Sequence, residues 1–472
     1  MDFTGEYNAV CAAFEQAIGC GRSFDLVARA FRIGNRALKL YFVNGLIATD
    51  STVKILGDLL TADANTYMTV TDAQTLSERL VPYVETRTTA DMQTAVTAVL
   101  SGQAVLVAEG VRGAVLADVR KYVSRTPDEP ENNRVLLGPH EGFNEVLLQN
   151  TALLRRRLRD PALTITLLQI GTRSKLDVAV CSVDGKADPK MLETVLGKLR
   201  SIRIETLAMA QESLLECLVP GRHFNPFPRV RYTERPDSAA ASVAEGSILV
   251  ITDNSPAVMV IPAGFFDFLQ DTNDFYFPPM LGSFLRMVRL FVFSSTMFLT
   301  PVWYLLVRNP QFIPPWLDFI RIDKPIAVPV LVQLIAIELV IDALKLASIN
   351  TPNSLSNSFS VIGALVLGQF AVEARWLTAE VVFYMAFVAV ANFTQPSFEM
   401  GHAYKMARLF VLALTALFNL WGFIAGYAVV FAVLVTTKNV VGQSYLYPLI
   451  PLNIQKLGRL LIRRPIHRDN AG

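Results

Sequence analysis

The stretch from Phe359 to Pro396 decides the fold. It reads FSVIGALVLGQFAVEARWLTAEVVFYMAFVAVANFTQP and contains two apolar runs. The first run carries Gly363, Gly368 and Gln369 and is followed by Glu373. A plain membrane anchor needs about 20 apolar residues, and this run is shorter. Small and polar residues at membrane depth usually face other protein or water. The stretch therefore predicts a functional element inside a helical membrane domain.

The composition agrees with a membrane protein. The chain has 472 residues, of which 52% are apolar and only 18% are charged. That apolar excess is typical of an integral membrane protein. The formal net charge of +2 argues neither for nor against a nucleic-acid partner, and we expect no nucleic acid. The N-terminus has neither a basic segment nor an apolar segment of the signal-peptide kind, so we expect the first domain in the cytoplasm.

The cysteines and histidines predict neither a metal site nor a cofactor. Cys11, Cys20, Cys181 and Cys217 are scattered without a CxxC pair, and the four histidines do not cluster with them. We therefore expect free thiols in a reducing compartment.

The chain up to about residue 285 has the patterning of a soluble α+β protein. Val10, Phe14, Ala17 and Ile18 recur at helical spacing, and the run 24–44 mixes basic with apolar residues. Predicted hairpins join 104–108 to 114–119, 163–170 to 176–183 and 247–252 to 257–261, and predicted helices cover 189–200 and 204–218.

An arginine run ends the helix that precedes the second hairpin. Arg155, Arg156, Arg157 and Arg159 suit a helix C-terminus. The run predicts either a solvated face or a contact with phosphate, lipid headgroups or another subunit.

We expect an α+β cytoplasmic N-terminal region with two subdomains, followed by an α-helical multi-span membrane domain. The predicted boundaries are 1–126 for a first α/β subdomain, 127–235 for a second α+β subdomain with its linker, 236–289 for a hairpin and membrane-interface segment, 290–440 for four to six spans, and 441–472 for a basic cytoplasmic tail.

Three charged residues fall inside the second apolar run of the membrane half. Glu338, Asp342 and Lys345 lie on one helical face. A charge at membrane depth costs at least ~3 kcal/mol on insertion scales. We expect an Asp342–Lys345 pair, with Glu338 facing a protein or water-filled interior. The alternative is an interfacial amphipathic helix whose charges reach the water.

The last apolar run, 406–435, is too long for one simple crossing. It contains Asn419 and the helix-packing candidates Gly422 and Gly426, so it either forms one helix or two short helices that meet near Asn419. The GxxxG spacing allows close packing, within the chain or between copies.

Several ordered motifs resemble the GerA family of spore germination proteins. They are EP at Glu129-Pro130, GPHEGFNEVLLQNTALLRRRL at 138–158, TERPD at 233–237, EG at 245–246, VIGALVLGQFAVEA at 361–374 and YLYPLIP at 445–451. The segments DNSPAVMVIPAGFFDFLQ at 253–270 and INTPNSLS at 349–356 are similar to a sporulation-type member of the family.

The chain departs from the receptor-type pattern at three places. The receptor-type signature usually has Arg where His140 stands and an acid near Asn132-Asn133. The Glu-x-x-Arg of the family's membrane part is here Asp342-x-x-Lys345.

The resemblance implies a spore inner-membrane protein that assembles into a ring with a central pore. It implies contacts with membrane lipid, with further copies of itself and with other germination membrane proteins, and monovalent cations as permeant ions. The N-terminal domain and the C-terminal tail would be cytoplasmic, on the spore core side.

Gly363, Gly368, Gln369 and Glu373 are the candidates for lining that pore. Gln369 and Glu373 are four residues apart, so a symmetric assembly would stack them as two polar rings. A glutamate ring would favour cations. The alternative is that the glycines permit close packing and Glu373 marks the membrane surface.

No P-loop, GxSxG, HExxH or dinucleotide-binding GxGxxG is present, so we expect no enzyme and no catalytic residue. The leading hypothesis is an oligomeric ion channel that releases cations and promotes or amplifies germination. The alternative is a non-conducting scaffold or signal-coupling subunit of a germinant receptor complex.

Overall fold

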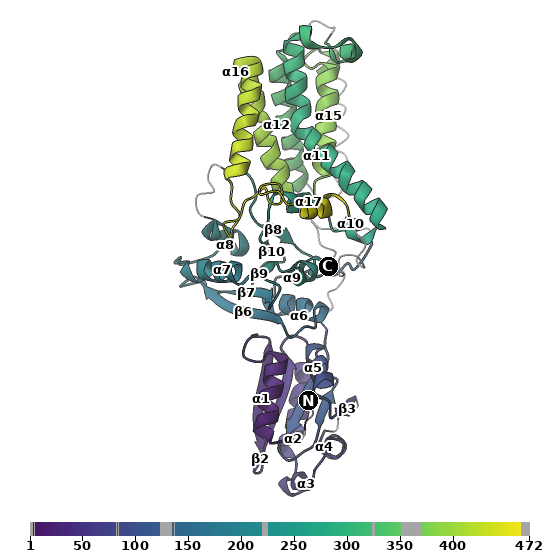
Figure 1. The fold of residues 1–472 in the computed structure, drawn as a ribbon, viewed down its shortest axis with the longest axis vertical. Helices are drawn as coiled ribbons and strands as arrows, with labels where there is room; N and C mark the ends of the chain where they lie inside the picture. Colours follow the sequence, from purple (N-terminus) through teal and green to yellow (C-terminus); the bar gives the residue numbers. More distant parts are fainter. Residues whose placement is uncertain are drawn as a thin grey trace. The chain divides into compact units, whose positions relative to one another are not determined.

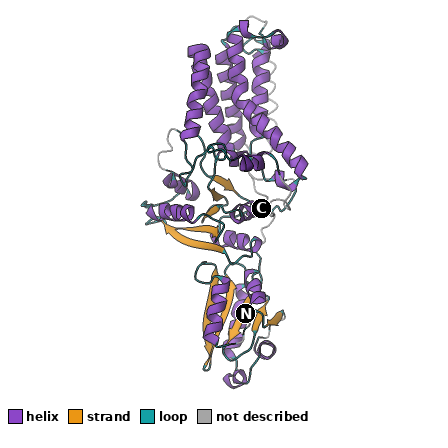
Figure 2. Cartoon of the chain, in the orientation of Figure 1, coloured by secondary structure: helices purple, strands orange, loops and turns teal. Residues whose placement is uncertain are grey.

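The computed structural model describes residues 3, 5–81, 83, 85–122, 135, 137–219, 225–322, 326–350 and 371–463. The chain divides into two compact units. The first comprises Met1–Pro220 and Val230–Ala263, and the second comprises Gly221–Arg229 and Gly264–Gly472. Strands lie in the first unit, whereas the second is helical (Figure 2). The α+β region and the helical region expected from the sequence are both present.

The first sheet is antiparallel and has the order β1-β2-β4-β5-β3. Its strands are β1 (Leu26–Ile33), β2 (Arg36–Val43), β3 (Thr86–Thr89), β4 (Ala104–Ala108) and β5 (Ala114–Ala117). Its helices are α1 (Tyr7–Ile18), α2 (Thr49–Thr61), α3 (Ala64–Met68), α4 (Ala73–Leu80) and α5 (Met92–Leu100). Figure 1 labels β2 and β3 of this sheet and the helices α1 to α5. The expected helix at the N-terminus and the hairpin of β4 with β5 are confirmed.

Helices bury both faces of this sheet. On one face, Tyr41 of β2 packs with Phe14 of α1 and belongs to the same core as Val99 of α5. On the other face, Leu40 of β2 shares a core with Leu59 of α2. Because successive side chains of a strand point to opposite faces, one short strand supplies both cores.

The second sheet has the order β6-β7-β9-β10-β8 and is also antiparallel. Its strands are β6 (Leu163–Ile170), β7 (Leu176–Val183), β8 (Arg231–Thr233), β9 (Ile248–Thr252) and β10 (Val258–Ile261). Its helices are α6 (Leu147–Arg157), α7 (Pro189–Ser201), α8 (Ala210–Leu218) and α9 (Pro236–Ala244). The helix expected from residue 204 begins later, at Ala210.

The hairpin of β9 with β10 belongs to this sheet and not to a separate membrane-interface segment. β9 pairs with β7 from Val178↔Thr252 to Cys181↔Leu249. All residues of β9 and β10 are buried. The expected boundary at 235 is therefore wrong, because a strand from beyond it completes the sheet.

The second unit is built from helices. They are the 3-10 helices η2 (Phe265–Leu269), η3 (Pro310–Phe312) and η4 (Pro315–Ile320), and the α-helices α10 (Asn273–Tyr276), α11 (Pro279–Arg308), α12 (Val330–Asn350), α14 (Ala371–Glu373), α15 (Ala379–Phe393), α16 (Phe398–Thr436) and α17 (Ile454–Leu461). Among the described residues, α11 and α16 are long and apolar enough to cross a membrane. The four to six expected spans stay a prediction, because 351–370 lie outside the described residues.

Helix α16 reverses direction at Asn419, whose φ of 53° and ψ of −132° are not helical. A Cβ atom on Gly426 would lie 3.2 Å from Cα of Val411. In a continuous helix these two residues would be about 22 Å apart. α16 is therefore two helices folded against each other, as in one of the two alternatives that the sequence left open.

Candidate functional site

The charged residues of α12 meet two basic residues of α16. Arg408 Nη2 donates to Glu338 Oε2 at 2.6 Å, and Arg408 Nη1 donates to the Thr296 carbonyl of α11 at 3.1 Å. The side chains of Glu338 and Arg408 are only 5% and 2% exposed. This pair therefore links three helices inside the apolar unit.

A second pair lies next along the same helices. Lys405 Nζ donates to both carboxylate oxygens of Asp342 at 2.6 Å. Glu338 and Asp342 are four residues apart on α12, and Lys405 and Arg408 are three residues apart on α16. Each helix therefore presents its two charged residues on one face. We name Glu338, Asp342, Lys405 and Arg408 the ion-pair ladder.

The ladder corrects the pairing expected within α12. The partner of Asp342 is Lys405 and not Lys345, whose Nζ lies 5.1 Å from the ring centre of Phe393. Glu338 faces protein, as expected, and its burial does not fit an interfacial helix.

Lys405 and Arg408 were missed as site residues. Both stand in the motif YKMARL at 404–409, at the start of the long apolar run. An arginine inside an apolar run is itself a signal, because a charge at membrane depth needs a partner.

The pore-lining candidates are mostly outside the described part of the chain. Gly363, Gly368 and Gln369 fall in 351–370, which the structure does not describe. Glu373 is the last residue of α14 and is exposed.

Gly422 and Gly426 pack within the chain. A Cβ on Gly422 would collide with the Leu414 carbonyl, and one on Gly426 would crowd Val411. Both glycines therefore allow the two halves of α16 to lie together, which is the packing role expected of them.

The turn of α16 is fastened to the end of α11. Asn309 and Asn419 exchange side-chain hydrogen bonds of 2.7 and 2.8 Å. Arg308 donates to the carbonyls of Thr415 and Ala416. A cation at the C-terminal carbonyls of a helix is favoured by the helix dipole, so this contact stabilises the first half of α16.

In the first unit, Arg155 joins the two sheets. Its guanidinium donates to both oxygens of Asp25 at 2.9 and 3.1 Å, and also to Ser23 Oγ and the Leu163 carbonyl. Neither Arg155 nor Asp25 is more than 1% exposed. Arg155 is thus neither solvated nor available to lipid, in contrast to both expected roles of the arginine run.

Two sequence motifs meet beside that helix. Arg235 of TERPD is buried, forms a bidentate ion pair with Asp237 and donates to the Pro139 carbonyl at 2.9 Å. The Phe143 amide donates to the Glu234 carbonyl at 2.8 Å. These motifs therefore stabilise the fold, whereas the neighbouring His140 is exposed.

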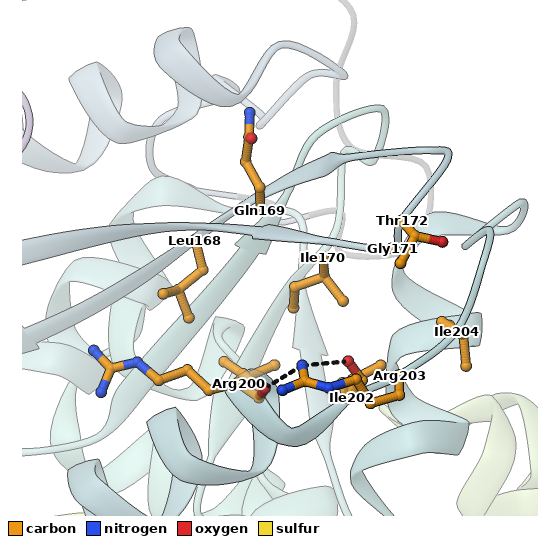
Figure 3. A pocket seen from close by; sticks show the side chains of 10 residues that line it. Leu168, Gln169, Ile170, Gly171, Thr172, Arg200, Ile202, Arg203 and Ile204 are labelled. Carbon is orange, nitrogen blue, oxygen red and sulfur yellow. Dashed lines mark hydrogen bonds between the residues drawn. The ribbon is translucent and has the colours of Figure 1, made fainter.

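A groove of about 170 Å³ lies between the end of β6 and the end of α7. In Figure 3, Leu168 and Ile170 point toward the end of the helix, whereas Gln169 points away. Arg203 Nη1 donates to the Arg200 carbonyl at 3.0 Å and so occupies the helix terminus. The groove has an apolar floor and a basic rim.

The cysteines are free, as expected. Burial raises the pKa of the Cys181 thiol, which keeps it protonated. Within the described residues no group of His, Cys, Asp or Glu is arranged to hold a metal ion.

Comparisons with known proteins agree in pointing to one family. The family model of the Bacillus/Clostridium GerA spore germination protein matches residues 13–471. Stage V sporulation protein AF of Bacillus subtilis is 36% identical over 456 residues, which cover 95% of this chain and 91% of that protein. Spore germination protein B1 of Bacillus subtilis is 30% identical, over 78% of this chain and 76% of that protein.

A solved structure is also similar to part of the chain. The N-terminal domain of the A subunit of the Bacillus megaterium spore germinant receptor GerK3 shares 22% identity, with a TM-score of 0.44. The match covers 56% of this chain and 98% of that domain. With the family model matching nearly from end to end, the chain belongs to the GerA family of spore germination proteins.

Proposed function

We propose that this protein is an oligomeric ion channel of the spore inner membrane that releases monovalent cations and promotes germination. The observation that carries the proposal is the ion-pair ladder within an apolar helical unit. Ionisable residues at membrane depth are rare and mark ion pathways or proton relays. The names of the relatives, which are germination and sporulation proteins, give the process.

Stability alone does not account for the ladder. Replacing a buried ion pair by apolar residues of similar volume is often neutral or stabilising by about 1–4 kcal/mol. Glu338 and Arg408 nevertheless lie buried beside the apolar side chains of α11, α12 and α16. A functional role explains their presence better than a stabilising one.

Glu373 supplies the expected cation preference. It is exposed at the end of α14, just before α15. In a symmetric ring, one such carboxylate from each copy would form an acidic ring, which favours cations. Gln369 and the two glycines of the same stretch complete the proposed lining.

Charge at the helix ends supports the proposed orientation. Arg286 and Arg289 stand in the first turns of α11, and Lys456 and Arg463 stand in the tail. Basic residues gather on the cytoplasmic side of membrane spans. The N-terminal region and the tail would then both face the spore core.

The experiment is cation flux through liposomes that contain the purified full-length protein. We expect a potassium flux above that of empty liposomes, and a lower preference for cations over anions in Glu373→Gln. Gln369→Leu should reduce conductance. Glu78→Gln, in the first unit, is the matched loss of one carboxylate and should change neither quantity. Unchanged conductance and selectivity in both lining variants would refute the lining.

A non-conducting scaffold or signal-coupling subunit is the second candidate. The observation that favours it is that each ladder carboxylate is neutralised by a base of the same chain. In this case the first unit would bind other germination membrane proteins, and neither candidate involves catalysis. Absence of flux from the purified protein, alone and together with those proteins, would favour the scaffold.

A further inference from the structure

The segment from Leu449 to Ile462 exposes a set of large apolar side chains. We name them the tail surface; they are Leu449, Ile450, Leu452, Ile454 and Ile462. Ile454, the first residue of α17, is 74% exposed. Large apolar side chains that are exposed close together along the chain are typical of a surface that contacts a protein or a membrane.

Helix α17 separates apolar from polar residues. Leu457 and Leu460 are half-buried, while Gln455 and Lys456 are exposed. Lys456 Nζ lies 5.2 Å from the ring centre of Tyr447. Helices of this kind lie in the plane of a membrane interface, with basic residues on the polar side.

The position of α17 is fixed by the start of α11. Arg286 Nη1 donates to the Leu460 carbonyl at 2.8 Å, and the Arg463 amide donates to Ser283 Oγ at 3.0 Å. Arg463 Nη1 also donates to the carbonyl of the buried Asp274 at 3.0 Å. α17 is therefore held where α11 begins, rather than being a loose end.

The first turns of α11 expose apolar side chains as well. Met280, Phe284, Met287 and Phe291 are all exposed and recur at helical spacing, so they lie on one face of α11. Two helices joined by hydrogen bonds thus both present apolar side chains to their surroundings.

Charge decides between a membrane and a second copy of the chain. From Leu449 to Arg463 the sequence has three basic residues and no acidic residue. Two tail surfaces placed together would bring like charges into contact, whereas an anionic bilayer surface complements them. We propose that α17 lies in the headgroup layer, with the tail surface toward the acyl chains and Lys456 toward the phosphates of anionic phospholipids.

This inference rests on the proposed membrane location of the chain and not on ion conduction. Its test uses full-length protein in liposomes, with the four cysteines replaced by alanine and one nitroxide-labelled cysteine added. The three label sites are Ile454→Cys on the tail surface, Gln455→Cys on the polar side, and Val429→Cys in α16 as the marker of membrane insertion. Oxygen enters the bilayer and a nickel chelate stays in water, so their relaxation effects report depth.

We expect the ratio of oxygen to nickel accessibility to be several-fold higher at Ile454 than at Gln455. Equal ratios at these two sites, together with a Val429 label that is more accessible to oxygen than to the nickel chelate, would overturn the inference. The membrane location would then still hold. A water-accessible Val429 would instead refute the membrane location on which both proposals depend.

The anionic preference is tested in vesicles of phosphatidylcholine with and without phosphatidylglycerol. Phosphatidylglycerol should move the Ile454 label deeper, and Lys456→Gln should weaken that shift. Inorganic phosphate added to phosphatidylcholine vesicles should leave the depth unchanged. A shift produced by phosphate alone would overturn the lipid assignment in favour of a free phosphate site, and no shift with phosphatidylglycerol would refute the anionic preference.

Discussion

Arg155 shows how differently the members of one arginine run are placed. Its guanidinium is fully buried and bonded to Asp25, whereas Arg156 and Arg157 reach the partly exposed Glu141. Successive residues of a helix point about 100° apart, so neighbours in the sequence enter different surroundings. The burial of Arg155 makes its single acidic partner, Asp25, more important than any surface charge of that unit.

Removing Asp25 should therefore destabilise the first unit strongly. We expect Asp25→Asn to cost about 3–5 kcal/mol, because it leaves a buried charge without its counter-charge. Asp184→Asn, which removes an exposed partner of Arg22, should cost about 0–1 kcal/mol. Hydrogen exchange of β1 and β6 amides in the full-length protein measures both. Similar losses of protection in the two variants would contradict this account.

The same physical argument applies to Glu338 in the helical unit. Glu338→Gln should lower the melting temperature of the detergent-solubilised protein, since a broken buried pair costs about 3–5 kcal/mol. The exchange Glu338→Arg with Arg408→Glu should recover part of the loss. Asp318→Asn, at an exposed pair with Arg321, is the control. A swap no more stable than the single variant would argue against direct pairing.

At the scale of elements, the reversal within α16 is open to a distance measurement. Phe410 and Val429 are both exposed and lie in opposite halves of α16. A continuous helix would separate them by about 28 Å. Nitroxide labels at the two positions should lie well below that distance in the wild-type protein. Gly422→Leu should lengthen the distance, because its side chain meets the backbone of Leu414. A wild-type distance near the straight-helix value would exclude the reversal.

The start of α5 predicts a pH dependence. Asp91 caps this helix, and hydrogen bonds from the Thr94 hydroxyl and amide lower the pKa of its carboxyl group. A carboxyl group whose pKa is lower in the folded state stabilises the folded state at pH values above its unfolded pKa of about 3.9. That stabilisation is lost as the pH falls through the folded pKa. The melting-temperature difference between wild type and Asp91→Asn should thus shrink on acidification; a constant difference would contradict the role of the charge.

The sequence predicts some elements well for identifiable reasons. β6 and β7 match their predicted bounds, because both are apolar runs separated by a polar turn with Gly171. The residue pattern does not predict β1 and its partner β2, because β1 is an edge strand whose exposed Arg29 and half-buried Phe31 break the alternation. The residue pattern also does not predict ion pairs between different helices, because nothing in the spacing of Asp342 and Lys345 indicates Lys405 as the partner.

At the scale of the whole molecule, the chain passes repeatedly between its two units. Residues 221–229 belong to the second unit, and 230–263 return to the first. The returning segment supplies β8, β9 and β10, which are three of the five strands of the second sheet. The first unit is therefore not encoded by one uninterrupted stretch that ends at Pro220.

This interruption predicts which fragments fold. A fragment of residues 1–263 should be soluble and unfold cooperatively, whereas 1–220 should aggregate, because it leaves β7 as an unpaired edge next to an exposed apolar core. Circular dichroism during denaturation compares the two fragments. Cooperative unfolding of 1–220 would show that β6 and β7 suffice, against the pairing of β7 with β9.

The backbone reversal at Asn419 also determines on which side of a membrane the chain continues after α16. If α16 lies in the bilayer, its two halves form one out-and-back excursion, so the chain leaves at Thr436 on the face where it entered at Phe398. A straight α16 would deliver the YLYPLIP motif and everything after it to the opposite compartment. The sidedness of the C-terminus thus depends on one residue's backbone angles and on two glycines without side chains to obstruct the return.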